Sequence, residues 1–386
     1  MKRTPSLAHR GRSSIAAVLV PALALTACTT AGAPRTAQPE AAASSARVSR
    51  ELDARVPGLL AEYEISSVGV AVIEDGRVAL AKEYGEQSPG VPATTATLFN
   101  LASLTKPVTA EVILRLASTG ALSLDEPMAR YWTDPDIATD PRREKLTARI
   151  ALAHQTGFPN WRPEGGRLAF TSDPGTAFGY SGEGYDYLGR FAEKRVGRSF
   201  ETLAQEYVLG PIGMSSTSFS RRAWMQGRLA TPRDSAGRWG HPQVSDSGHW
   251  SGANNLITTV GDYATFVVSV MNGERLTKAM TEERFRAASG PQPPFGCKIE
   301  PASLCPRGLN FALGWIRLDY ERGPIMAFLG MNDRIGGAER TLVYFDPLQR
   351  SGVVVLTSGR NGQRLLLDVV DIVEPGSRLA AFLRSR

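Results

Sequence analysis

The chain of 386 residues carries 44 Lys and Arg against 38 Asp and Glu, which gives a formal net charge of +6 at pH 7. Four of the cations lie at the very start of the chain, at Lys2, Arg3, Arg10 and Arg12, and without them the charge is 6 − 4 = +2. A charge this small, without basic clusters interleaved with aromatic residues, argues against a nucleic-acid partner. The length exceeds that of a usual single-core domain and predicts two lobes.

Residues 1–27 are predicted to be an export signal, because the four cations precede an apolar run from Ile15 to Leu25 that is too short for a stable membrane span. The run ends in Leu25-Thr26-Ala27-Cys28, which resembles a bacterial lipobox. The resemblance implies cleavage before Cys28 and attachment of lipid to its thiol. The protein would then be exported and anchored to a bacterial membrane, on the periplasmic face of the outer membrane if the host has two membranes. The alternative is a simple secretory signal with a chance cysteine.

Residues 28–47 are small and polar and include proline, so they are predicted to form a flexible tether before a folded domain at 48–386. That domain opens with a helical periodicity over 48–63. Two β-rich runs follow, joined by Asp75-Gly76, a dipeptide that favours a tight hairpin. A helix is then predicted from Ser103 to Ser118.

The middle of the chain, 121–299, is rich in short helical stretches and Gly/Pro turns, with one clear helix at 260–273. Further β-like runs lie at 311–320, 325–331, 340–347 and 351–359, before a closing helix at 363–374. Strands at both ends with helices between them predict an α/β fold whose sheet is completed by both termini. The expected α/β lobe comprises 48–120 and 300–386, and the helical lobe comprises 121–299. Clefts between lobes are common places for sites.

Ser103 and Lys106 stand three residues apart in the stretch NLASLTKPVTA, which places them on one face of the predicted helix. At a helix N-terminus the backbone N–H groups favour negative charge, so an alkoxide or oxyanion is stabilised there. A partly desolvated lysine loses its proton more easily and can accept that of the serine. The pair is chemically competent, although Ser-x-x-Lys alone occurs by chance in many chains.

The surroundings of this pair resemble the superfamily of serine β-lactamases, penicillin-binding proteins and related esterases, in particular its class C-like branch. The stretches that carry the resemblance, in chain order, are TLFNLASLTKPVTAEVILRLASTGALSLDEPMARY, LTARIALAHQTGFPNW, DPGTAFGYSGEGYDYLGRF, VLGPIGMSSTSF and FALGW, within residues 50–370. The resemblance implies a β-lactamase-like fold, an antiparallel sheet flanked by helices, and cofactor-free hydrolysis through an acyl-enzyme. It assigns Ser103 as nucleophile, Lys106 as its base and Tyr180 as proton shuttle.

Two motifs depart from the family pattern. Gly182 stands where an asparagine is usual, two residues after Tyr180. In the third motif, matched through Gly336-Gly337 with a possible slip of one residue, Met331, Asn332 and Asp333 replace a cation, a small polar residue and a glycine. The family completes its oxyanion hole with a strand N–H, which this register places near Arg334, beside that of Ser103. The backbone N–H donor does not depend on the side chains of this motif. A clamp for a substrate carboxylate needs the cation that Met331 cannot supply.

Other reactive residues have plainer interpretations. Cys297 and Cys305 lie eight residues apart in a Pro/Gly-rich segment, where export would allow a local disulfide; two free thiols are the alternative. The histidines show no metal-binding spacing, and His154 matches a position that is structural in the family. Three tryptophans either wall the cleft or pack in a core: Trp161, Trp250 and Trp315.

The sequence thus predicts an envelope serine hydrolase, without metal or cofactor, that acts on small esters, amides or peptides. One alternative is a β-lactamase or DD-peptidase that has replaced the missing cation, for example with Arg334. Another is a non-catalytic member that binds an envelope partner.

Overall fold

The structure, a computed structural model, describes residues 38–234, 236–289, 297, 299–333 and 338–386. The predicted export signal, Cys28 and the first part of the predicted tether lie outside the described residues. Helix α1 spans Gln38–Glu62. It therefore begins well before the predicted residue 48, and the end of the stretch predicted as tether is helical, because its alanines favour a helix. Contacts group Pro39–Arg386 into one compact unit.

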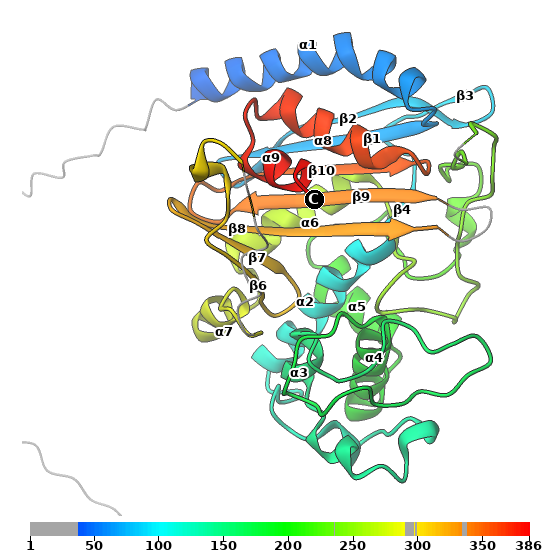
Figure 1. Cartoon of the computed structure of the whole chain (residues 1–386). Coiled ribbons are helices and arrows are strands. Elements are labelled where there is room, and N and C mark those ends of the chain that lie inside the picture. Colours follow the sequence, from blue (N-terminus) through cyan, green and yellow to red (C-terminus); the bar gives the residue numbers. More distant parts are fainter. Residues whose placement is uncertain (1–37, 235, 290–296, 298, 334–337) are drawn as a thin grey trace, which may run out of the picture. The chain divides into compact units, whose positions relative to one another are not determined.

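An eight-stranded sheet forms the centre of this unit, with every neighbouring pair antiparallel (Figure 1). The strand order is β3-β2-β1-β10-β9-β8-β7-β6, so the N-terminal hairpin pairs with the last strand, as predicted. The strands are β1 (Ser67–Glu74), β2 (Arg77–Ser88), β3 (Val91–Pro92), β6 (Gly308–Phe311), β7 (Ile316–Tyr320), β8 (Gly323–Asn332), β9 (Glu339–Asp346) and β10 (Ser351–Ser358). This confirms the predicted α/β class and β-lactamase-like architecture.

One face of the sheet packs against α1, α8 (Gly362–Val373) and α9 (Arg378–Arg384), which Figure 1 shows together on that side. Apolar residues of α1 recur every fourth position, at Val48, Leu52, Val56 and Leu60, and this stripe is buried in the shared core. A helix with such a stripe is stable chiefly because the sheet covers it.

The opposite face carries the helical insert and α2 (Thr105–Ser118), which share a second hydrophobic core with it. The further helices are α3 (Ala148–Leu152), α4 (Gly182–Val196), α5 (Phe200–Ala204), α6 (Val260–Asn272) and α7 (Lys278–Arg284). A separate two-stranded ladder joins β4 (Phe99–Asn100) to β5 (Ile257–Thr258). It ties the insert to the chain immediately before Ser103.

Local chemistry explains where the predicted elements hold and where they differ. The hairpin is present, with Asp75 at φ 51° and Gly76 at φ 72°, both in the left-handed region that a tight two-residue turn requires. The single strand predicted over 311–320 is two strands, because Gly314 turns the chain at φ 90° and packs so tightly on α2 that a Cβ there would lie 2.3 Å from the Cβ of Ala110. The helix predicted at 260–273 is present as α6, and α9 was not predicted.

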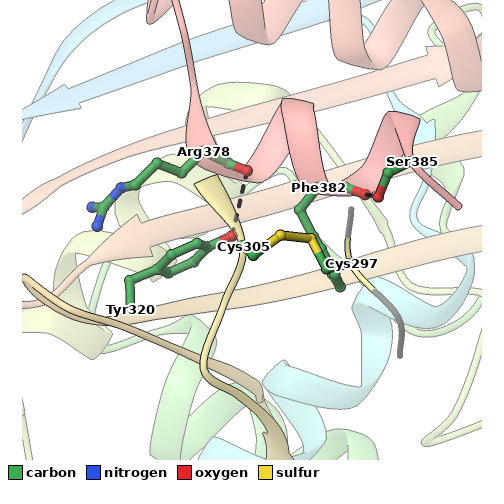
Figure 2. Close-up of a disulfide and its surroundings, with 6 residues drawn as sticks. All are labelled: Cys297, Cys305, Tyr320, Arg378, Phe382 and Ser385. Carbon is green, nitrogen blue, oxygen red and sulfur yellow. Dashed lines mark hydrogen bonds between the residues drawn. A yellow bond between two sulfur atoms is a disulfide. The ribbon is translucent and has the colours of Figure 1, made fainter. Parts of the chain in front are cut away.

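The disulfide between Cys297 and Cys305 is present, with a Cα–Cα distance of 5.9 Å. Figure 2 shows it beside Phe382 and Ser385 of the C-terminal segment. The bond therefore closes a loop next to α9, on the side of the sheet away from the helical insert.

Among the residues described, no helix is both long enough and apolar enough to cross a membrane.

Candidate active site

Ser103 lies in a short 3-10 helix (Ala102–Leu104) between β4 and α2. The side-chain carbonyl of Asn100 accepts a hydrogen bond from the N–H of Ala102 at 2.7 Å, and the hydroxyl of Thr105 donates to the Ala102 carbonyl at 2.7 Å. These bonds hold Ala102 at φ 47°, a conformation that costs a non-glycine residue about 1 kcal/mol or more. The strained turn leaves Ser103 partly exposed among buried neighbours.

Lys106 is buried on the first turn of α2, and its Nζ lies 3.1 Å from the Oγ of Ser103 and 2.8 Å from the carbonyl oxygen of Ala253. Burial lowers the pKa of Lys106 to about 7, and the negative charge of Asp186 opposes this shift. A large fraction of Lys106 is therefore neutral at pH 7. A neutral amine at this distance can accept the proton of the Ser103 hydroxyl.

Tyr180 lies over the same pair, with its ring centroid 4.8 Å from the Nζ of Lys106 and its hydroxyl in a hydrogen bond with Ser103. Burial raises the pKa of Tyr180 to about 12, so the phenol is neutral and keeps a proton to donate. The ring stacks on His154 at a centroid distance of 4.5 Å. The structure thus brings together the three predicted catalytic residues Ser103, Lys106 and Tyr180.

His154 packs against Tyr180 and binds the backbone next to it. Its Nδ1 accepts a hydrogen bond from the N–H of Ser181 at 3.1 Å, and burial lowers its pKa well below the ordinary value. A neutral imidazole fixed in this way positions the segment that carries Tyr180. Among the hydrogen bonds of the described residues, none joins His154 to Ser103.

Strand β8 reaches the nucleophile at Gly330. A Cβ on Gly330 would lie 2.5 Å from the carbonyl oxygen of Leu101 and 3.2 Å from the backbone N of Ser103, so only glycine fits. The hydroxyl of Thr341 on β9 donates to the same Leu101 carbonyl at 2.9 Å. The sequence reading did not single out Gly330, although a glycine between bulky apolar residues within a strand is a signal of close backbone approach.

The predicted third-motif residues lie beyond this contact. The Met331 side chain is 65% exposed, Asn332 is buried beside Glu339, and Asp333 forms an ion pair with Arg340 at 2.6 Å. Arg334 lies outside the described residues. The β8 segment that passes Ser103 is therefore Gly330–Met331, a few residues before the register expected from the sequence.

Asp186 is a site residue that the sequence reading missed. Its carboxylate accepts hydrogen bonds from the hydroxyl of Ser251 and the N–H of Gly252, both at 2.8 Å. This loop supplies the Ala253 carbonyl that binds Lys106. Burial raises the pKa of Asp186 to about 6. An aspartate inside a helix gives no sequence signal for such a role, which arises only when 186, 251–253 and 106 meet in the fold.

Gly182 begins α4, after Ser181, whose hydroxyl accepts from the N–H of Gly184 at 3.0 Å and caps the helix.

Among the described residues, no group of three or more His, Cys, Asp or Glu side chains is arranged to hold a metal ion.

Comparisons with known proteins fit this geometry. A curated relative, protein flp of Staphylococcus aureus (strain MW2), is 26% identical over 191 residues, which cover 45% of this chain and 38% of flp. Esterase EstB of Burkholderia gladioli is 28% identical over 207 residues, which cover 45% of this chain and 52% of EstB. The chain therefore matches only about half or less of the length of these relatives.

Solved structures share the fold. The hydrolase EstCE1, described as having promiscuous acyltransferase activity, superposes with a TM-score of 0.71 at 18% identity over 86% of this chain and 99% of its own. The octameric penicillin-binding protein homologue from Pyrococcus abyssi gives a TM-score of 0.65 at 22% identity, over 81% of this chain and 74% of its own. A family model described as Beta-lactamase matches residues 52–370. The chain belongs to the beta-lactamase family.

Proposed function

We propose that the protein is a serine hydrolase that cleaves small esters, amides or peptides through an acyl-enzyme, with Ser103 as nucleophile. The observation that carries the proposal is the 3.1 Å contact between the Ser103 Oγ and the buried Nζ of Lys106, whose pKa lies near 7. Family membership supports hydrolase chemistry in general.

The contacts suggest the following course. Lys106 takes the proton of the Ser103 hydroxyl as Oγ attacks the carbonyl carbon of the substrate. The N–H of Ser103 and an N–H of β8 beside Gly330 would hold the resulting oxyanion. Tyr180, neutral and hydrogen-bonded to Ser103, donates a proton to the leaving group and is replenished from Lys106. The same groups then take a proton from the water that attacks the acyl carbon, and they return a proton to the Ser103 Oγ as its bond to the acyl group breaks, which releases the acid and restores the site.

The side chains of β8 near Gly330 offer no cation for a substrate carboxylate, because Phe328 and Leu329, which precede it, are apolar. Met331 is apolar, Asn332 is neutral, and Asp333 is an anion that already binds Arg340. None of these three supplies a cation for the carboxylate of a penicillin-like or D-Ala-D-Ala substrate. Esters and small amides need no such cation.

The first test is hydrolysis of p-nitrophenyl butyrate by residues 29–386 and by the Ser103→Ala variant. We expect the variant to lose at least about 10³-fold in kcat/KM, because the nucleophile is gone while binding remains. Ser247→Ala, at an exposed serine, is the matched control and should keep full activity.

Equal rates for wild type and Ser103→Ala in folded samples would contradict the proposal. A stable adduct on Ser103 with a β-lactam, without ester turnover, would instead support the DD-peptidase alternative. Absence of labelling by every serine-directed probe would support a non-catalytic binding role.

We propose in addition that the protein is exported and anchored to a bacterial membrane through lipid on Cys28. The lipobox-like Leu25-Thr26-Ala27-Cys28 and the preceding cationic and apolar segment support this. In a bacterial host, wild type should partition into the detergent phase after Triton X-114 extraction, while Cys28→Ala should move to the aqueous phase or stay unprocessed. The same partition for both chains, together with the same processed size, would count against the anchor.

A further inference from the structure

The indole ring of Trp161 occupies the space above Gly182. A Cβ on Gly182 would lie 2.5, 2.6 and 2.8 Å from three carbon atoms of this ring, distances that real Cβ atoms essentially never show. The backbone of Gly182 is helical and lies outside the left-handed region, so its conformation does not demand glycine. The neighbouring ring, in the position it occupies, leaves no room for a larger side chain at 182, so such a side chain would have to displace it.

The same ring lies beside the reactive pair. The Nζ of Lys106 is 6.0 Å from the centroid of Trp161 and 4.8 Å from that of Tyr180. Trp161 nevertheless remains 39% exposed. One side of the indole is thus packed against the start of α4, while the rest is an open apolar surface within reach of a group attached to a carbonyl at Ser103.

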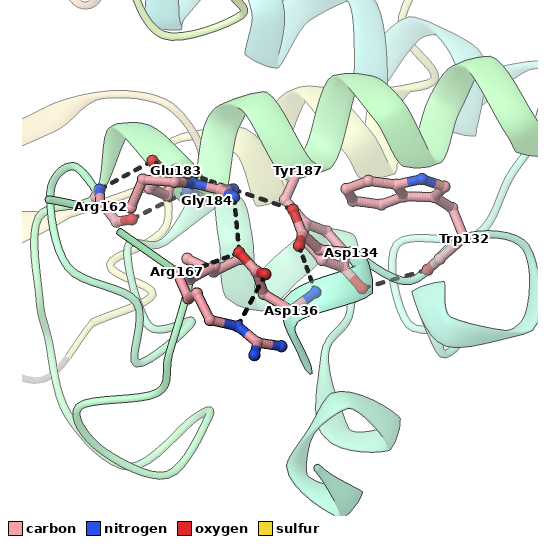
Figure 3. A network of polar contacts seen from close by, with 10 residues as sticks. Trp132, Asp134, Asp136, Arg162, Arg167, Glu183, Gly184 and Tyr187 are labelled. Atoms are coloured by element: carbon pink, nitrogen blue, oxygen red, sulfur yellow. Dashed lines mark hydrogen bonds and ion pairs between the residues drawn. The ribbon is translucent and has the colours of Figure 1, made fainter. Parts of the chain in front are cut away.

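Polar contacts of Asn160 and Arg162, the residues before and after Trp161 in the chain, fix the backbone that carries the ring. The N–H of Gly182 donates to the backbone carbonyl of Asn160 at 2.9 Å and to its side-chain carbonyl at 3.0 Å. Arg162 forms ion pairs with three carboxylates, drawn in Figure 3: Glu183 at 2.7 Å, Asp134 at 3.0 Å and Asp136 at 3.1 Å. A ring pinned before substrate arrives costs little entropy on binding.

We propose that Trp161 is a specificity-determining residue that binds an apolar group of the substrate, so that the preferred substrates are esters with a bulky apolar acyl or alcohol group. This inference rests on the proposed hydrolysis at Ser103. Each methylene that leaves water on such a surface raises kcat/KM by up to roughly fourfold, so two methylenes raise it by up to roughly fifteenfold. Gly182 is the small residue that makes room for the indole.

The test compares kcat/KM for p-nitrophenyl butyrate and p-nitrophenyl acetate in wild type, Trp161→Ala and Trp161→Phe. We expect a butyrate-to-acetate ratio of roughly ten in wild type, near one in Trp161→Ala, and between the two in Trp161→Phe, with the loss mostly in KM. Trp224→Ala removes a tryptophan of similar exposure, 37%, elsewhere on the surface and should leave the ratio unchanged.

A second series keeps the acetyl group and varies the alcohol, as methyl against benzyl acetate. If Trp161→Ala loses the preference in kcat/KM for the larger ester in the acyl series, the acyl group lies on the indole. If it loses the preference only in the alcohol series, the alcohol group lies there. Both results support the proposal. Unchanged ratios in both series overturn it.

Gly182→Ala offers an independent check, because its methyl group must displace the ring. In the wild-type background it should lower the kcat/KM ratio of whichever ester series responds to Trp161→Ala. In the Trp161→Ala background it should have no further effect on that ratio. A Gly182→Ala variant that folds and keeps the wild-type ratio would contradict the proposal. If wild type hydrolyses neither ester and no probe labels Ser103, the proposed function itself fails; labelling of Ser103 with an unresponsive ratio means that only the role of Trp161 fails.

Discussion

The pKa of Lys106 near 7 sets the pH at which the proposed reaction can begin. Above this pH most of the amine is neutral and can accept the Ser103 proton, so kcat/KM should rise as pH rises through about 7. Asp186 is the charged group that works against the effect of burial on Lys106. It also accepts two hydrogen bonds from the loop that presents the Ala253 carbonyl.

Asp186→Asn is expected to move the rising limb of the kcat/KM profile to lower pH by roughly half a unit to one unit. The amide keeps an acceptor for Ser251 and Gly252 but removes the charge that favours protonated Lys106. Asp262→Asn is the control, since Asp262 is another partly buried acid with a raised pKa whose partners, Ser216 and Thr217, lie away from Lys106. A limb that stays in place or moves upward would refute the coupling.

The sequence predicted those site residues that belong to motifs shared with the β-lactamase superfamily. Ser103, Lys106 and Tyr180 meet as expected. Gly330, Asp186 and the fit between Trp161 and Gly182 were not predicted, because each depends on contacts between segments far apart along the chain. The pattern of residue types within one segment carries no information about them.

Helix α2, which follows the nucleophile, is fixed by buried charges as well as by apolar packing. The carboxylate of Glu111 lies 2.9 Å from Arg284 of α7 and 3.6 Å from Arg115, and all three side chains are at most 1% exposed. Arg115 also donates to the hydroxyl of Ser269 and to the carbonyl of Tyr207. These partners come from three segments of the insert, so the cluster locks α2 against it.

Glu111→Gln should destabilise the protein by about 3–5 kcal/mol, because it leaves two buried guanidinium groups without a compensating anion. Urea unfolding followed by circular dichroism would measure the change. As a control, Lys278→Ala breaks an exposed pair with Glu282 and should cost less than about 1 kcal/mol. A loss for Glu111→Gln as small as that of the control would show that the buried cluster contributes little.

Elements with strong local signals were predicted well, as in the Asp75-Gly76 hairpin and α6. Boundaries were missed where tertiary contact decides them. Gly314 splits a continuous apolar run because α2 lies against it, and the 3-10 turn at Ser103 replaces the expected first turn of the helix because Asn100 and Thr105 hold Ala102.

Across the whole molecule, one sheet separates two hydrophobic cores, and a buried acid lies at the first residue of the interior strand β9, opposite Asn332 of β8. Glu339 of β9 is 2% exposed, and burial raises its pKa to about 8. Between about pH 4.5 and 8 the folded protein therefore holds a proton at this site that the unfolded chain has released. The free energy of unfolding must fall as pH rises through that window.

Glu339→Gln removes the contribution of this proton to the free energy of unfolding, and the amide has nearly the same shape as the carboxyl group. Its stability relative to wild type should be smallest near pH 5 and should increase up to about pH 9, by on the order of a few kcal/mol. Lys106 has the opposite pH dependence but is present in both proteins, so it cancels in the difference. Glu282→Gln, at an exposed acid, should show no such trend. Melting temperatures across this range would decide, and a constant difference would exclude titration of Glu339 as the cause.

The pairing of β1 with β10 has a consequence for how the protein is made. Ser67 lies opposite Ser358, so the first long strand has one neighbour, β2, until almost the entire chain has been synthesised. An isolated hairpin is at best marginally stable in water. During synthesis from the N-terminus, β1 and β2 therefore lack the strand that joins them to the rest of the sheet. Because the last long strand completes the sheet, the sheet can close only when almost the whole chain is available.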